Sequence, residues 1–327
     1  MAREAAVSVA SVSRALNGNS SVHPDTRARI TAAVEALGYV PHAGARSLSL
    51  ARSQAIGVVL PDLHGEFFSE IVRGMDREVS AHGYHLLLSN MHADAALAAQ
   101  AMRSMRGRVD GLIVMAPQLD ASGLEAALPP DAPVILINPC DGVGHASFRI
   151  DNASGIVASV VHLVALGRRR LVHVAGPDGN IDARERHDAY LAAMAQYAPE
   201  VTPIVVTGDF HEESGAEAVA KLRDRGVAYD GIVAANDVMA LGVLRALRDD
   251  GVPVPDAVAV TGFDDIPLAR YLGLTTVRVP LAEMGGRAVA RLVAALSGAE
   301  LTHETQTVTT QLVPRATTAL PHAPGAA

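Results

Sequence analysis

The 327-residue sequence has no tryptophan, a single cysteine (Cys140) and no long uninterrupted apolar run. One cysteine excludes an internal disulfide, and no residues around it have zinc-ligand spacing. The apolar runs are shorter than the ~20 residues of a membrane span, and the N-terminus lacks an apolar signal core. We therefore expect a cytoplasmic protein. With 49% hydrophobic residues, the chain can form a packed core, and its length corresponds to about two domains.

Basic charge is scarce and unevenly distributed. The chain carries a net charge of −8, yet residues 1–53 contain six arginines and three acidic residues, which gives +3 and leaves −11 for the remainder. A small basic segment ahead of a large acidic body is typical of a protein whose N-terminal part contacts a polyanion.

The N-terminal segment is predicted to form short helices joined by tight turns. Residues 2–6 are helical in type, Ser8 is a candidate N-cap for a helix over Val9–Leu16, and another helix follows Pro24 and ends at Gly38. The first two make a helix-turn-helix. In Val9–Leu16, the pattern predicts one face with Val9, Val12 and Leu16, and an opposite face with Ala10, Ser13, Arg14 and Asn17. Small polar residues and one arginine suit a DNA major groove; a helical cap on an enzyme is the alternative.

The rest of the chain alternates strand-like and helix-like segments. Apolar runs at 55–60, 84–89, 111–115 and 134–137 have the length of buried parallel strands, and a second set lies at 171–175, 204–206, 231–235 and 258–262. Helices are predicted at 68–81, 153–166, 183–195, 212–225, 237–249 and 282–297. Two successive β-α series indicate an α/β core of two doubly wound subdomains.

Polar side chains gather where these strands end, which is where such sheets bind ligands. The group comprises Asp62, Asp151, Asn236, Asp237 and Asp264, and Arg186 on a following helix adds a forked donor. Four aromatic residues, Phe67, Phe68, Tyr190 and Phe263, are placed to pack against apolar sugar faces. Carboxylates and amides bind hydroxyl groups, so the pattern predicts a site for a sugar or nucleoside. The alternative for each carboxylate is a loop cap or turn residue, above all for Asp237.

Catalytic motifs are missing. Paired carboxylates suit glycoside hydrolysis, but nothing identifies a proton-donating partner. We find no Ser-His-Asp order, HExxH, phosphate-binding glycine loop or GxGxxG in a supporting context. We therefore expect neither an enzyme nor a cofactor or metal site.

Several segments follow one another in a familiar order: AREAAVSVASVSRALNGNSSVHPDTRARITAAVEALGYVPHAGARSL, then PDLHGEFF, LGRRRLVHVAGP, AANDVMALGVL, VTGFDDIP and LVPRAT. They strongly resemble the lactose-repressor (LacI/GalR) family of bacterial transcription regulators, over nearly the whole chain. The resemblance implies a lambda-repressor-like, all-α helix-turn-helix over 1–41, a hinge helix and linker over 42–54, and a periplasmic-binding-protein-like (type I) core over 55–327. The N-subdomain would comprise about 55–152 and 280–308, and the C-subdomain about 153–279 and 309–320.

The same resemblance implies roles for individual residues. Val9, Ala10, Ser13 and Arg14 correspond to base-reading positions, Ala45 and Arg46 lie in the matching hinge, and Leu48 matches a leucine that enters the minor groove. Arg186, Asn236, Asp151 and Asp264 correspond to effector contacts, with Asp62 and Phe67 at the pocket mouth. The sequence departs from the family where Gly65-Glu66 replaces the usual Asn-Pro, where Ala189 replaces glycine, and at Met1, where the first helix is shortened.

These features imply a homodimeric repressor that binds a near-palindromic operator and responds to a small effector, most simply a sugar. It would be cytoplasmic and associated with the nucleoid when bound to operator. The alternatives are a cytoplasmic sugar-binding protein with a defective DNA-binding head, a phosphorylated-cofactor sensor that binds a partner protein, and a sugar-processing enzyme.

Overall fold

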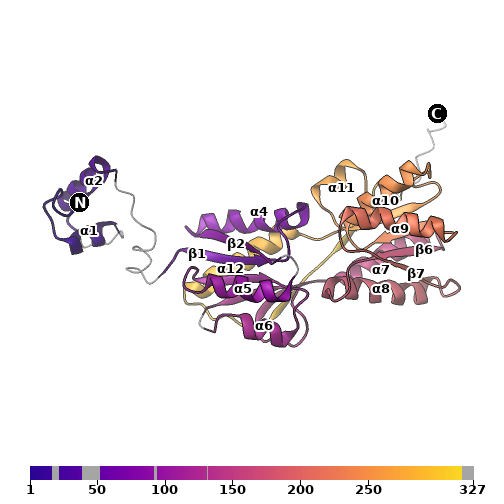
Figure 1. Cartoon of the computed structure of the whole chain (residues 1–327), viewed down its shortest axis with the longest axis horizontal. Helices are drawn as coiled ribbons and strands as arrows, with labels where there is room; N and C mark the ends of the chain where they lie inside the picture. Colours follow the sequence, from indigo (N-terminus) through magenta and orange to yellow (C-terminus); the bar gives the residue numbers. More distant parts are fainter. Residues whose placement is uncertain (17–21, 39–51, 92–93, 131, 319–327) are drawn as a thin grey trace.

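A small helical head precedes two α/β subdomains (Figure 1). The computed structural model describes residues 1–16, 22–38, 52–91, 94–130 and 132–318. The head contains α1 (Val9–Leu16) and α2 (Pro24–Ala36), preceded by a helical turn in which the Val7 N–H donates to the Ala2 carbonyl at 3.0 Å. The Ser8 hydroxyl accepts from the Ser11 N–H at 3.1 Å, which confirms the predicted N-cap.

The N-subdomain is a parallel six-stranded sheet in the order β11-β5-β4-β3-β1-β2. Its strands are β1 (Ala55–Leu60), β2 (His85–Asn90), β3 (Gly111–Met115), β4 (Val134–Ile137), β5 (Ala146–Ile150) and β11 (Thr305–Val308). Helices α4 (Glu66–Ala81) and α12 (Leu281–Leu296) pack on one face, and α5 (Ala95–Met105) and α6 (Ala121–Ala127) on the other. Glycine allows α4 and α12 to touch, since a Cβ at Gly74 would lie 1.8 Å from the Ala282 carbonyl oxygen.

The C-subdomain repeats this plan with the order β12-β10-β9-β8-β6-β7, in which only β12 is antiparallel to its neighbour among the described strands. Its strands are β6 (Leu171–Ala175), β7 (Ile204–Thr207), β8 (Gly231–Ala234), β9 (Ala259–Asp264), β10 (Thr275–Arg278) and β12 (Gln311–Val313). Helices α7 (Asn152–Ala165) and α8 (Ile181–Tyr197) cover one face, α9 (Glu212–Asp224) and α10 (Asp237–Asp249) the other, and the short α11 (Pro267–Tyr271) follows β9.

The chain passes between the sheets after β5, after β10 and after β11, so three connections join the subdomains (Figure 1). The predicted α/β class with two doubly wound subdomains is confirmed, and each predicted strand and helix of the core has a counterpart. The prediction missed β5, β10, β11 and β12, because these short strands include polar, threonine-rich segments such as Thr305–Val308 that lack a continuous apolar run. It also missed α5, α6 and α11.

Within the described part of the chain, none of the helices combines the length and the apolar character that crossing a membrane requires.

Candidate functional site

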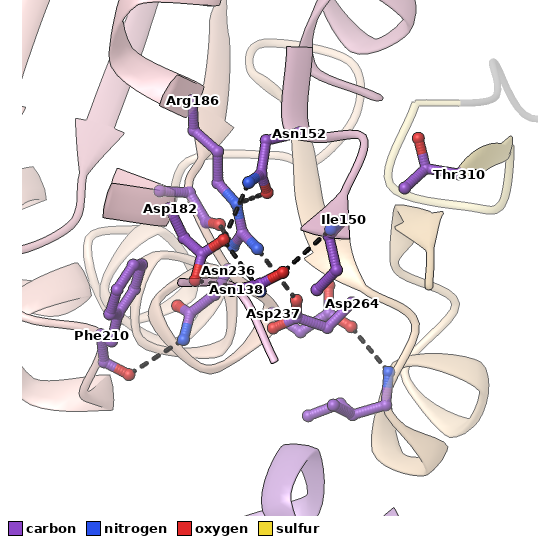
Figure 2. A network of polar contacts seen from close by, with 12 residues as sticks. Asn138, Ile150, Asn152, Asp182, Arg186, Phe210, Asn236, Asp237, Asp264 and Thr310 are labelled. Atoms are coloured by element: carbon purple, nitrogen blue, oxygen red, sulfur yellow. Dashed lines mark hydrogen bonds and ion pairs between the residues drawn. The ribbon is translucent and has the colours of Figure 1, made fainter. Parts of the chain in front are cut away.

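A buried arginine is the centre of a polar network at the junction of the two subdomains (Figure 2). Arg186, on α8, is 3% exposed. Its Nε donates to Asn152 Oδ1 at 2.8 Å and its Nη1 to the Ala235 carbonyl at 2.6 Å. Its guanidinium carbon lies 3.8 Å from the centroid of the Phe263 ring, a cation–π contact. These contacts fix the direction of the guanidinium group before any ligand arrives.

Asp264, the last residue of β9, faces this guanidinium without a hydrogen bond to it. Asp264 Oδ1 lies 3.6 Å from Arg186 Nη2, which is an ion pair but too long for a hydrogen bond. Among the described residues this buried oxygen has no hydrogen-bond partner. Burial raises the pKa of Asp264 to about 7, with Arg186 opposing the rise and Asp182 adding to it. An unpaired, buried acceptor beside a fixed donor is the arrangement that a ligand hydroxyl completes.

Asp182 links the two subdomains, and the sequence analysis missed it. Both of its carboxylate oxygens accept from Asn138 Nδ2, at 3.0 and 3.2 Å, and Oδ1 also accepts from Asn152 Nδ2 at 2.8 Å. Asn138 follows β4 of the N-subdomain, whereas Asp182 lies on α8 of the C-subdomain. The signal that identifies Asp182 is its four-residue spacing from Arg186, which places both side chains on one face of a helix.

Asn152 and Glu185, also missed, complete the network. Asn152 Nδ2 donates to Glu185 Oε2 at 2.8 Å, and Glu185 forms an ion pair with Arg149. Arg149 in turn pairs with Asp141. The predicted residue Asp151 is the neighbour of Asn152, but it caps α7 by accepting from the Ser154 N–H at 3.0 Å. The position next to the predicted one therefore supplies the group that contacts Arg186.

Two predicted residues at the start of α10 serve mainly local structure. Asn236 caps the helix by accepting from the Met239 N–H at 2.9 Å, and its Nδ2 donates to the Phe210 carbonyl at 3.0 Å. Asp237 is fully buried, and its oxygens accept from the Ile266 N–H and the Thr276 hydroxyl. Burial raises the pKa of Asp237, and the neighbouring Asp264 adds to the rise. Because both oxygens have protein partners, Asp237 holds the β9–α11 turn to the sheet.

The aromatic residues divide between junction and interior. Phe67 and Phe68 pack edge to face, 5.0 Å between centroids, at the start of α4, and Phe67 contacts the hydrophobic clusters of both subdomains. Tyr190 is a correction to the predicted site. It is 0% exposed, and its hydroxyl donates to the Leu171 carbonyl at the first residue of β6, the end of the sheet opposite the network.

Asp62, predicted at the mouth of the site, is partly exposed after β1. It accepts from the N–H groups of Leu63 and His64 at 2.6 and 3.0 Å. Burial opposes ionisation, but the bonds from His64 and Leu63 outweigh it and lower the pKa of Asp62. Its negative charge is therefore retained at neutral pH.

The exposed face of α1 carries the described candidate DNA contacts: Val9, Ala10, Ser13 and Arg14. Assigning Val9 to the apolar face with Val12 was wrong, because Val9 is 75% exposed and Ala15 occupies the buried face instead. Val9 thus joins the residues with which the family resemblance grouped it. The other four candidates, Asn17, Ala45, Arg46 and Leu48, lie outside the described residues.

Comparisons with known proteins agree with this arrangement. Residues 1–42 match the bacterial regulatory proteins, lacI family, and residues 160–318 match a periplasmic binding protein-like domain. The HTH-type transcriptional regulator GalS of Salmonella typhimurium is 35% identical over 289 residues, which cover 87% of this chain and 85% of GalS. The chain belongs to the lacI family of bacterial regulatory proteins.

Solved structures of lacI-family regulators share its architecture. The Lac repressor dimer bound to operator and the anti-inducer ONPF has a TM-score of 0.88 and 29% identity, and 98% of each chain is covered. The complex of the transcriptional regulator CelR with cellobiose has a TM-score of 0.73 and 28% identity over 97% of this chain and 98% of CelR. The predicted family and fold class are thus confirmed, and this lacI-family chain is a transcriptional regulator with a helix-turn-helix head.

Proposed function

We propose that this regulator represses transcription as a homodimer, and that a sugar or sugar derivative bound at the junction of its subdomains controls its affinity for operator DNA. The observation that carries the sugar proposal is the unpaired Asp264 Oδ1 atom beside the fixed guanidinium of Arg186. A hydroxyl group both donates and accepts, so it satisfies both side chains at once. Structures of similar regulators are described as complexes with cellobiose and with ONPG.

The DNA-binding half of the proposal rests on α1. Its exposed residues Val9, Ala10 and Ser13 are small, which permits close approach to a major groove, and Arg14 supplies a forked donor for a guanine edge or a phosphate. In a dimer, two such helices reach adjacent major grooves of a near-palindromic operator. The similar Lac repressor structure contains a dimer on its operator. A protein of this kind acts where the DNA is, in the cytoplasm.

We infer that effector binding and DNA binding are coupled at the junction of the two subdomains. Asp182 and Asn138 join the subdomains next to Arg186, so a ligand that binds Arg186 and Asp264 favours one relative position of the subdomains. The free energy of operator binding then changes by as much as the ligand's binding free energy differs between the two subdomain arrangements, typically about 1–3 kcal/mol. No step of this mechanism is a chemical reaction, and we propose no catalytic activity.

Binding-site selection from a random DNA pool tests the regulator, and a thermal-shift screen with neutral sugars, sugar phosphates and nucleosides identifies an effector. The Arg186→Ala variant should select the same near-palindrome but lose the effector response. Arg184→Ala is the matched control, since Arg184 is exposed on the same helix. If Arg186→Ala loses DNA binding at unchanged stability, the assignment of Arg186 to effector binding alone is wrong. A folded dimer that enriches no DNA yet binds a sugar would instead be a binding protein with a defective head.

A further inference from the structure

A glutamate bridges the two subdomains at a second place, away from Arg186. Glu66 is the first residue of α4, in the N-subdomain, and its Oε2 accepts from the N–H of Leu268 on α11, in the C-subdomain, at 2.8 Å. The two helices lie next to each other where the subdomains meet (Figure 1). The bond joins residues that are 202 positions apart in the sequence.

The Leu268 N–H is a group that needs an external acceptor. The first N–H groups of a helix have no partner within it. In α11 the first residue, Pro267, has no N–H, so Leu268 offers the first one, and the N-cap residue Ile266 provides no side-chain acceptor. The Glu66 carboxylate therefore caps α11 from the other subdomain, with a charge-assisted bond.

The same carboxylate also lies at the start of its own helix. A negative charge in the first turn is favourable because the helix dipole is positive there. Glu66 thus lies in the first turn of α4 and accepts a hydrogen bond from the first N–H of α11. Separation of the two ends leaves the charge favourable for α4 but removes the cap of α11.

Glu66 follows Gly65, which is the N-cap residue of α4. Gly65 adopts a φ of 83°, which glycine tolerates, and leads the chain into α4.

We propose that Glu66 is a positioning residue that latches the subdomains in the arrangement seen here. Its bond with Leu268 is lost when the subdomains rotate apart, so it shifts the balance toward the latched arrangement in the absence of any ligand. The consequence for operator binding rests on the function proposed above. The latch itself is measurable without DNA or effector.

Hydrogen exchange on the full chain tests the latch, because a second amide reports on the same junction. The Ile181 N–H donates to the Pro117 carbonyl of the other subdomain at 3.2 Å, and it shares no residue with the Glu66 bridge. In Glu66→Asp, which keeps the charge but is one methylene shorter, and in Glu66→Ala, the Leu268 and Ile181 amides should both exchange about three- to ten-fold faster than in the unaltered chain. The control is Glu70→Gln, since Glu70 pairs with Arg73 within α4.

Three results would overturn the latch. Faster exchange at Leu268 with unchanged exchange at Ile181 would make Glu66 a local cap of α11 only. Faster exchange in Glu66→Ala but not in Glu66→Asp would trace the effect to charge at the start of α4. Equal acceleration in Glu70→Gln would trace it to the stability of α4 as a whole.

Discussion

The buried carboxyl group of Asp264 predicts a particular dependence of stability on pH. Its pKa in the folded chain is about 7, against an ordinary value of 3.8. Between these values the folded protein keeps a proton that the unfolded chain has lost, so the free energy of unfolding falls as the pH rises from about 4 to about 7. A difference of about 3 between the two pKa values corresponds to a loss on the order of 4 kcal/mol.

The variant Asp264→Asn removes this titration with little change in shape. Asparagine, like aspartate, tolerates a positive φ, and Asp264 has a φ of 115°. Above pH 7 the variant should be more stable than the unaltered chain by up to a few kcal/mol, because it no longer buries a charge. Its free energy of unfolding should also vary less between pH 4 and 7. The response to the effector should weaken, since an amide does not replace a charged acceptor.

Urea titrations at several pH values between 4.5 and 8.5 measure both effects. Asp256→Asn, an exposed site, serves as the control and should leave the pH dependence unchanged. The reasoning is refuted if Asp264→Asn keeps the full decline of stability with pH, or if it is less stable than the unaltered chain at pH 8.5. Either result would mean that Asp264 is charged and well compensated in the folded protein.

Two further substitutions separate DNA contacts, ligand contacts and core. Arg14→Ala should weaken operator binding by about 1–3 kcal/mol in a binding assay if Arg14 reads a base, and it should reduce sequence preference at one position of the operator. Equal weakening for all DNA sequences would show instead that Arg14 contacts a phosphate. Tyr190→Phe should lower the free energy of unfolding by about 1–3 kcal/mol, because the buried Leu171 carbonyl loses its donor. The effector response measured on the same variant should stay unchanged. A variant that keeps full stability but loses this response would show that Tyr190 contributes to the effector site.

The order of the eight apolar core strands and the places where they end were predictable from the sequence, because apolar runs and their spacing determine them. The same rule located Asp264 and Asn236 beside the network around Arg186. This rule could not tell which of these side chains cap the helix that follows them. Asp151 and Asn236 both act as N-caps, which depends on local backbone geometry that the spacing of residues does not reveal.

Tyr190 shows a second limit of spacing arguments. Arg186 and Tyr190 are four residues apart, so both lie on the face of α8 that packs against the sheet. The helix runs opposite to the strands, and one turn advances it about 5.4 Å. That single turn carries Tyr190 away from the carboxyl ends of the strands, toward the start of β6. Residues on one helix face therefore need not share a site.

The cost of leaving Asp264 Oδ1 without a hydrogen bond argues for a role of this residue in ligand binding. Among the buried side chains that the structure describes, two atoms lack a hydrogen-bond partner, His173 Nε2 and Asp264 Oδ1. His173 avoids a charge, since burial lowers its pKa to about 4 and a neutral ring loses only a weak bond. Because the pKa of Asp264 is about 7, about half of its carboxyl groups are charged at neutral pH. A hydroxyl that enters the junction meets an acceptor that lacks a hydrogen bond, so its hydrogen bond there replaces a penalty rather than an existing bond.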